Sequence, residues 1–173
     1  ASDLLRPLSR RCGQFITRPA MGTLSPFPRK TPLTVYSRLN RLMADEHVFY
    51  INNRHARLLL CIHQDGRLRM ALERHDEILI TLIDWLLQRT RFLDDEAEVS
   101  PFTTAQKPRL TERVETSSDS RQIGINLLHD HEFMIERLIR DHAECERGFR
   151  DAASAGLVLK VLDLHKDMAS DLR

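Results

Sequence analysis

Turn-forming residues are scarce over most of this sequence. Its 173 residues include six glycines and seven prolines, and five of the prolines lie before Leu33. Because glycine and proline interrupt regular structure, their scarcity after Leu33 predicts long helices rather than a sheet. No apolar run approaches the roughly 20 residues that a membrane span needs, so the sequence predicts no contact with a membrane.

Cysteine is also rare, and no cysteine-based motif is present. Cys12, Cys61 and Cys145 are dispersed and have no metal-ligand spacing. An odd, scattered set predicts a reducing compartment rather than a disulfide framework. The sequence also lacks a glycine-rich phosphate loop and the Gly-x-Ser-x-Gly turn of serine hydrolases, which argues against those two classes of enzyme.

Acidic residues are missing from the interval between Leu4 and Ala44. Residues 1–44 carry eight basic side chains and one acid, Asp3, for a net charge of +7, whereas the remaining 129 residues carry −6. A basic tail on an acidic body predicts a polyanionic partner such as nucleic acid. The candidate DNA-binding residues in the tail are Arg6, Arg10, Arg11, Arg18, Arg29 and Lys30.

Residues 1–32 are predicted to form an irregular, proline-rich N-terminal arm, because they show neither a helical nor a strand period. Three interpretations remain open for this arm. It binds DNA phosphates, it is a solvated tail without a partner, or it is an organelle-targeting segment, since such segments are also rich in Arg and Ser and poor in acids.

Residues 33–173 are predicted to form the folded domain. Apolar residues recur with a helical period in four segments. The first helix is expected to begin near Thr31 as N-cap and to reach Leu60, and Ser154 is expected to cap the last helix. The second helix is expected over residues 66–93 and the third over 118–150. The long connection between them loses the period and contains Pro101 and Pro108.

Three segments of this domain follow patterns of a known family. Residues 39–45 read Leu-Asn-Arg-Leu-Met-Ala-Asp, residues 127–132 read Leu-Leu-His-Asp-His-Glu, and residues 165–169 read His-Lys-Asp-Met-Ala. In their order and spacing they resemble the Dps family, small ferritin-like bacterial proteins that protect DNA and oxidise iron. The resemblance implies an all-α, ferritin-like four-helix bundle whose long connection carries a short helix, for which residues 102–106 are the candidate. Ser170 stands where the family usually has Trp.

The family's iron ligands lie between two subunits and follow the pattern His-x11-His-x14-Asp-x3-Glu. At that spacing this chain has Arg57, Arg69, Asp84 and Gln88. Only Asp84 matches, and Gln88 stands in the Glu position. A guanidinium has no free lone pair, so Arg57 and Arg69 cannot bind a metal. We therefore expect a degenerate ferroxidase centre in which the arginines pair with Asp84 of a neighbouring subunit.

The resemblance implies a homo-oligomer, a dodecamer, that binds and protects DNA through the arm and sequesters iron under stress. Its location would be cytoplasmic or nucleoid-associated, or in an organelle if the arm is a targeting remnant. One alternative is a cage-forming or partner-binding structural protein without iron chemistry. Another is a hemerythrin-like di-iron binder built on His129, Asp130, His131, Glu132 and His142, which would need inward-facing histidines on other helices. We expect His55, His63 and His75 to be surface or interface groups.

Overall fold

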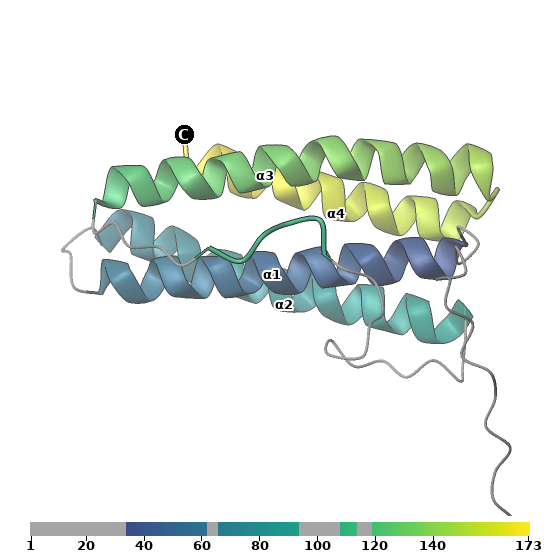
Figure 1. The fold of residues 1–173 in the computed structure, drawn as a ribbon, viewed down its shortest axis with the longest axis horizontal. Coiled ribbons are helices and arrows are strands. Elements are labelled where there is room, and N and C mark those ends of the chain that lie inside the picture. Colours follow the sequence, from purple (N-terminus) through teal and green to yellow (C-terminus); the bar gives the residue numbers. More distant parts are fainter. Residues whose placement is uncertain (1–33, 62–65, 94–107, 114–118) are drawn as a thin grey trace, which may run out of the picture. The chain divides into compact units, whose positions relative to one another are not determined.

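A computed structural model describes residues 34–61, 66–93, 108–113 and 119–173 of the chain. Most of these residues lie in four long helices: α1 (Val35–Leu60), α2 (Gly66–Leu93), α3 (Ser120–Ala143) and α4 (Ala152–Asp171). They form a four-helix bundle in which α1 lies beside α2 and α3 beside α4 (Figure 1). Segment 108–113, from the long connection between α2 and α3, is irregular and runs alongside α1, from Asp45 to Asn52. The predicted fold class is therefore confirmed. The N-terminal arm and the candidate short helix at 102–106 lie outside the described residues.

Local capping sets where the helices begin. The hydroxyl of Thr34 accepts a hydrogen bond from the Ser37 amide at 3.1 Å, and Ser37 Oγ accepts one from the Thr34 amide at 3.0 Å. This reciprocal pair satisfies two of the amides that every helix start leaves unpaired. Our expectation of Thr31 as the cap was wrong, because Thr34 holds that role.

The end of α3 also differs from the prediction of one helix over residues 118–150. The helix passes into a single π-helical turn, Glu144–Gly148, and Arg150 then adopts a left-handed backbone conformation with φ of 55°. The chain re-enters a helix at Asp151, whose carboxylate accepts from the Ser154 amide at 3.0 Å. Asp151 is thus the N-cap of α4 in place of the predicted Ser154.

The cysteine in this π-helical turn is part of the core. Cys145 is fully buried. Burial raises the pKa of its thiol to about 11, and the nearby carboxylates of Asp141 and Asp151 add to the effect. By contrast, Cys61 is exposed at the end of α1.

Two apolar clusters fill the interior of the bundle. The larger contains Phe49, Leu79 and Met134, and the smaller contains Ala56, Leu60, Leu72, Ile123 and Leu127. On α1, α2 and α3, buried polar residues occupy the turn between the two clusters. These residues are Asn52, Asn53, His75, Asp76, Asp130 and His131. A polar layer therefore separates the two apolar cores, and its side chains need partners inside the protein.

Candidate functional site

The residues at the predicted iron-ligand positions lie on α1 and α2. Asp84 and Gln88 are exposed and one helical turn apart on α2, and Arg69 is exposed near its start. Arg57 is partly buried on α1, and its Nε lies 3.2 Å from Asp76 Oδ2 of the same chain. Its Nη1 also lies 3.9 Å from Glu73 Oε1. Arg57 thus already has carboxylate partners within its own subunit.

This arrangement does not fit iron at the predicted intersubunit position. Iron needs carboxylate or neutral imidazole donors, and a guanidinium offers no lone pair and stays charged. The positive group at position 57 is held in place by Asp76, whose side chain is only 6% exposed and also accepts from Asn53 Nδ2 at 2.7 Å.

A second group of titratable side chains lies in and directly beside the polar layer, and the sequence analysis did not identify it as a site. Each helix contributes one: Glu46 from α1, His75 from α2, His131 from α3 and His165 from α4, and all four are fully buried. His165 Nε2 lies 3.0 and 3.1 Å from the two oxygens of Glu46, and His131 Nδ1 lies 3.0 Å from His165 Nδ1. Phe49 packs against both the His131 and the His165 rings.

A second carboxylate reaches the layer from the end of α4. Asp171 Oδ2 lies 3.4 Å from His75 Nε2 and 3.2 Å from Arg74 Nη2. Asp171 also lines an open groove of about 700 Å³ beside α2 and the C-terminus. The hydrogen bond from Arg74 is the main cause that lowers the pKa of Asp171, so this carboxyl group is ionised at neutral pH. It therefore accepts a hydrogen bond from His75 Nε2–H.

Burial keeps two of the imidazoles neutral. It lowers the pKa of His131 well below the ordinary value of 6.5, and His165 and His75 lower it further. Burial also lowers the pKa of His75, although the hydrogen bond to Asp171 opposes the effect. A neutral imidazole has one N–H donor and one nitrogen lone pair, so the partner of one nitrogen determines the state of the other.

The hydrogen bonds fix which nitrogen carries each proton when the cluster is neutral. The nearly equal distances from His165 Nε2 to both Glu46 oxygens fit one N–H directed between the two oxygens. His165 Nδ1 then accepts from His131 Nδ1–H, which leaves a lone pair on His131 Nε2. His75 donates through Nε2 to Asp171, which leaves a lone pair on His75 Nδ1. These two nitrogens are buried and have no hydrogen-bond partner.

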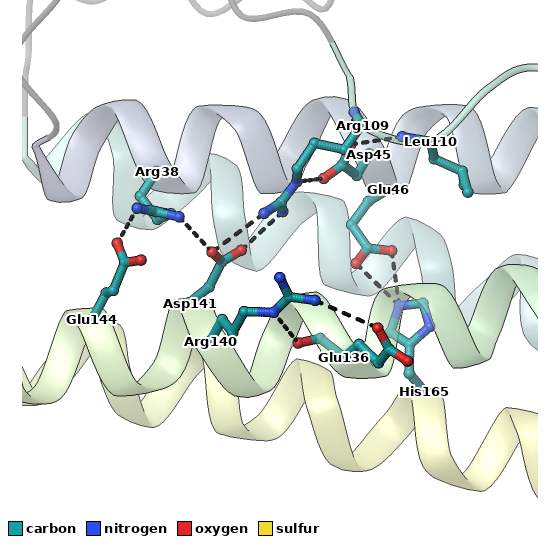
Figure 2. A network of polar contacts seen from close by, with 10 residues as sticks. All are labelled: Arg38, Asp45, Glu46, Arg109, Leu110, Glu136, Arg140, Asp141, Glu144 and His165. Carbon is teal, nitrogen blue, oxygen red and sulfur yellow. Dashed lines mark hydrogen bonds and ion pairs between the residues drawn. The ribbon is translucent and has the colours of Figure 1, made fainter.

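A network of ion pairs lies near this layer and joins the connection to the bundle (Figure 2). Arg109 Nε binds Asp45 Oδ2 at 2.6 Å and Arg109 Nη2 binds Asp141 Oδ2 at 2.8 Å. The backbone amides of Arg109 and Leu110 both donate to Asp45 Oδ1. Arg38 of α1 bridges Asp141 and Glu144. Burial raises the pKa of Asp45, and the nearby Arg109 charge opposes this rise. The Arg109 ion pair therefore favours the ionised form of the Asp45 carboxyl group.

Comparison with solved structures shows which fold this bundle represents. The chain superposes on the X-ray structure of Dps from Thermosynechococcus elongatus with a TM-score of 0.67, covering 80% of this chain and 87% of that one. The fold is that of Dps. Sequence identity over the Dps match is 20%, and no family model and no curated protein matches the sequence. Within the described residues, no helix is both long and apolar enough to cross a membrane.

The Dps-like bundle brings together residues that the sequence analysis had separated or assigned to the surface. Our expectation of a surface or interface position was wrong for His75, which is fully buried, whereas His129 is exposed. His55 is partly exposed, and His63 and the basic arm residues lie outside the described part. Inward-facing histidines do occur on α2, α3 and α4. However, no group of three or more His, Cys, Asp or Glu in the described residues is arranged to hold a metal ion.

The sequence does indicate that these histidines are buried, because they lie on the apolar stripes of their helices. His75 lies between Leu72 and Leu79, and His131 lies between Leu127 and Met134. Residues three to four apart share a helix face, so the same spacing that predicts core leucines also predicts core histidines.

Proposed function

We propose that this protein is a divergent Dps-like subunit that assembles into a homo-oligomeric cage, a dodecamer, which binds and protects DNA and sequesters iron under stress. Its intersubunit ferroxidase centre is degenerate. The observation that carries the proposal is a Dps fold over 80% of the chain combined with an ion-paired arginine at the first ligand position. Such a cage would be cytoplasmic or nucleoid-associated.

The charge distribution supports the DNA-binding part of the proposal. The arm adds six basic residues, and the remaining charge of the chain is negative. A cage would present many arms at once, and many weak contacts linked on one particle bind far more tightly than one arm alone.

The Arg57–Asp76 ion pair supports the degenerate site. Two functions are compatible with a degenerate site, and they differ in whether the cage takes up iron. A cage that still takes up iron would do so without this centre, whereas a purely structural cage would take up none. Iron content after aerobic loading with Fe(II), measured on a particle whose mass is about twelve times that of the chain, separates them. A stable monomer at micromolar concentration would contradict both.

The ferroxidase assay tests the degenerate centre directly. We expect the unmodified protein to oxidise Fe(II) no faster than the buffer blank. The triple variant Arg57→His, Arg69→His, Gln88→Glu restores the family's ligand types and is expected to oxidise Fe(II) faster than the parent. The matched control is Arg121→His, which adds an imidazole at an exposed position of α3 outside the ligand pattern. Rapid oxidation by the unmodified protein at two irons per site would contradict our assignment of Arg57 and Arg69.

A further inference from the structure

The groove of about 700 Å³ between the start of α2 and the end of α4 has a basic lining. Three arginines and a single acid line it, so its net charge is +2. These charged residues are Arg67, Arg74, Arg173 and Asp171. The N-terminal end of one helix and the C-terminal end of the other meet at this groove. Their dipoles therefore offset each other, and the arginines determine the sign of the local potential.

The acid in the groove is already engaged by groups of this chain. Asp171 Oδ2 accepts a hydrogen bond from Arg74 Nη2 at 3.2 Å and lies 3.4 Å from Nε2 of the buried His75. This contact holds Arg74 at the wall of the groove through one nitrogen. A guanidinium has five N–H donors, so those on Nε and Nη1 remain for a ligand.

The other two arginines also have donors to spare. Arg173 Nη2 lies 3.3 Å from Glu132 Oε1, a contact that again uses one nitrogen of the guanidinium. Arg67 is exposed and has no ion-pair partner in the described part of the chain. Even when Glu132 is counted against the lining, the positive charge of Arg67 is not balanced. The groove therefore favours an anion with several acceptor oxygens.

The residue at position 170 keeps this groove open. Ser170 is exposed and lines the groove beside Asp171. Its hydroxyl is a further hydrogen-bond donor. Its side chain is small, whereas a Trp, which the Dps family usually has at this position, is large enough to fill part of the space. The substitution thus leaves room for a ligand next to the arginines.

We propose that this groove binds one phosphate group per chain, held by Arg67, Arg74 and Arg173. The planar guanidinium binds phosphate oxygens through pairs of charge-assisted hydrogen bonds, which makes arginine the residue best suited to this anion. The site lies within one chain, so it depends neither on a cage nor on iron. Free phosphate and the backbone of a nucleic acid both present such a group, and the experiment distinguishes these two sources.

Isothermal titration with inorganic phosphate at low ionic strength tests the proposal. The six basic residues of the arm are changed to Gln in the full-length parent and in every variant, so that the arm adds no phosphate contacts. We expect one saturable phosphate per chain. Arg67→Gln and Arg74→Gln should each weaken binding about 5- to 10-fold, because each removes charged hydrogen bonds.

Two further variants separate the groove from the overall charge of the chain. Ser170→Trp leaves the charge unchanged and should weaken phosphate binding at least as much as the arginine variants, because it fills the groove. Arg91→Gln removes an exposed arginine from the last turn of α2, far from the groove, and should leave phosphate binding unchanged. Arg67 has no ion-pair partner whose loss could disturb the fold, so Arg67→Gln decides if another variant does not fold.

A titration with a short DNA duplex identifies the source of the phosphate group. If the duplex binds and Arg67→Gln and Arg74→Gln weaken its binding too, the groove holds a backbone phosphate. If inorganic phosphate binds and the duplex does not, the groove holds the free anion, and either result supports the proposal. The absence of saturable phosphate binding, or equal binding by the parent and the three groove variants, would overturn it.

Discussion

Asp151 shows how much one side chain contributes to this fold. Its carboxylate accepts from the Ser154 amide and hydroxyl and binds Arg89 Nη2 of α2 at 2.9 Å, so it both starts α4 and ties α4 to α2. Burial alone would raise the pKa of Asp151, but these hydrogen bonds outweigh it and the pKa is lowered from 3.8. A carboxyl group with a lowered pKa stabilises the folded state while it is ionised.

Replacing Asp151 with Ala should lower the free energy of unfolding at pH 7 by about 1–2 kcal/mol, the usual cost of losing a helix cap. The difference from the parent should shrink as the pH falls from 3.8 through the lower pKa of the folded protein, because the parent's carboxylate is protonated over that range. Urea unfolding at pH 7 and pH 3 measures both effects. Asp163→Ala, which removes an exposed ion pair with Lys166 in the same helix, is the control and should cost far less. An equal loss at both pH values would contradict the assigned role.

At the scale of elements, segment 108–113 of the connection between α2 and α3 is attached to the bundle through Asn52, Asp130 and Asp141, and at its start through Asp45. This fully buried carboxylate accepts two backbone amides and the guanidinium of Arg109. Asp45→Ala leaves all three donors without that acceptor, and breaking such a buried pair costs about 3–5 kcal/mol. We expect faster hydrogen exchange at the Arg109 and Leu110 amides, measured by mass spectrometry. Glu136→Ala removes an exposed pair with Arg140 and should leave this exchange unchanged.

The helices could be predicted from the sequence, and their partners could not. Apolar residues three and four apart specify a helix and its buried face, which is why α2 was predicted with its observed ends. The caps were missed because Thr31 and Thr34, or Asp151 and Ser154, are equally suitable residue types. The backbone geometry selects one of each pair, as the extended φ and ψ of Thr34 show. His131 and His165 are 34 residues apart in sequence, and His165 and Glu46 are 119 apart. No local pattern encodes such contacts.

At the scale of the whole molecule, the arm and the bundle carry opposite charges and are expected to have different roles. Deleting residues 1–30 removes six basic residues and one acid. We expect the intact protein to retard DNA of any sequence in a gel and the truncated protein to lose this activity. With six or more phosphate contacts, affinity should fall about 10³-fold or more between 50 and 200 mM salt.

A full-length variant separates the arm's charge from its length. Changing Arg6, Arg10, Arg11, Arg18, Arg29 and Lys30 to Gln keeps the chain intact, and it should weaken DNA binding as much as the deletion does. If the truncated particle retards DNA as well as the intact one, another surface binds DNA.

The burial of Cys145 makes the chain a reporter of its own opening. A thiol with a pKa of about 11 is a thiolate in only about one molecule in 10⁴ at pH 7, and the thiolate is the reactive form. Alkylating reagents will therefore modify exposed Cys61 in the native protein and reach Cys145 only when the junction between α3 and α4 separates. The rate at which Cys145 itself is alkylated, distinguished from Cys12 and Cys61 by peptide mass spectrometry, measures how often that junction opens, without any probe attached beforehand.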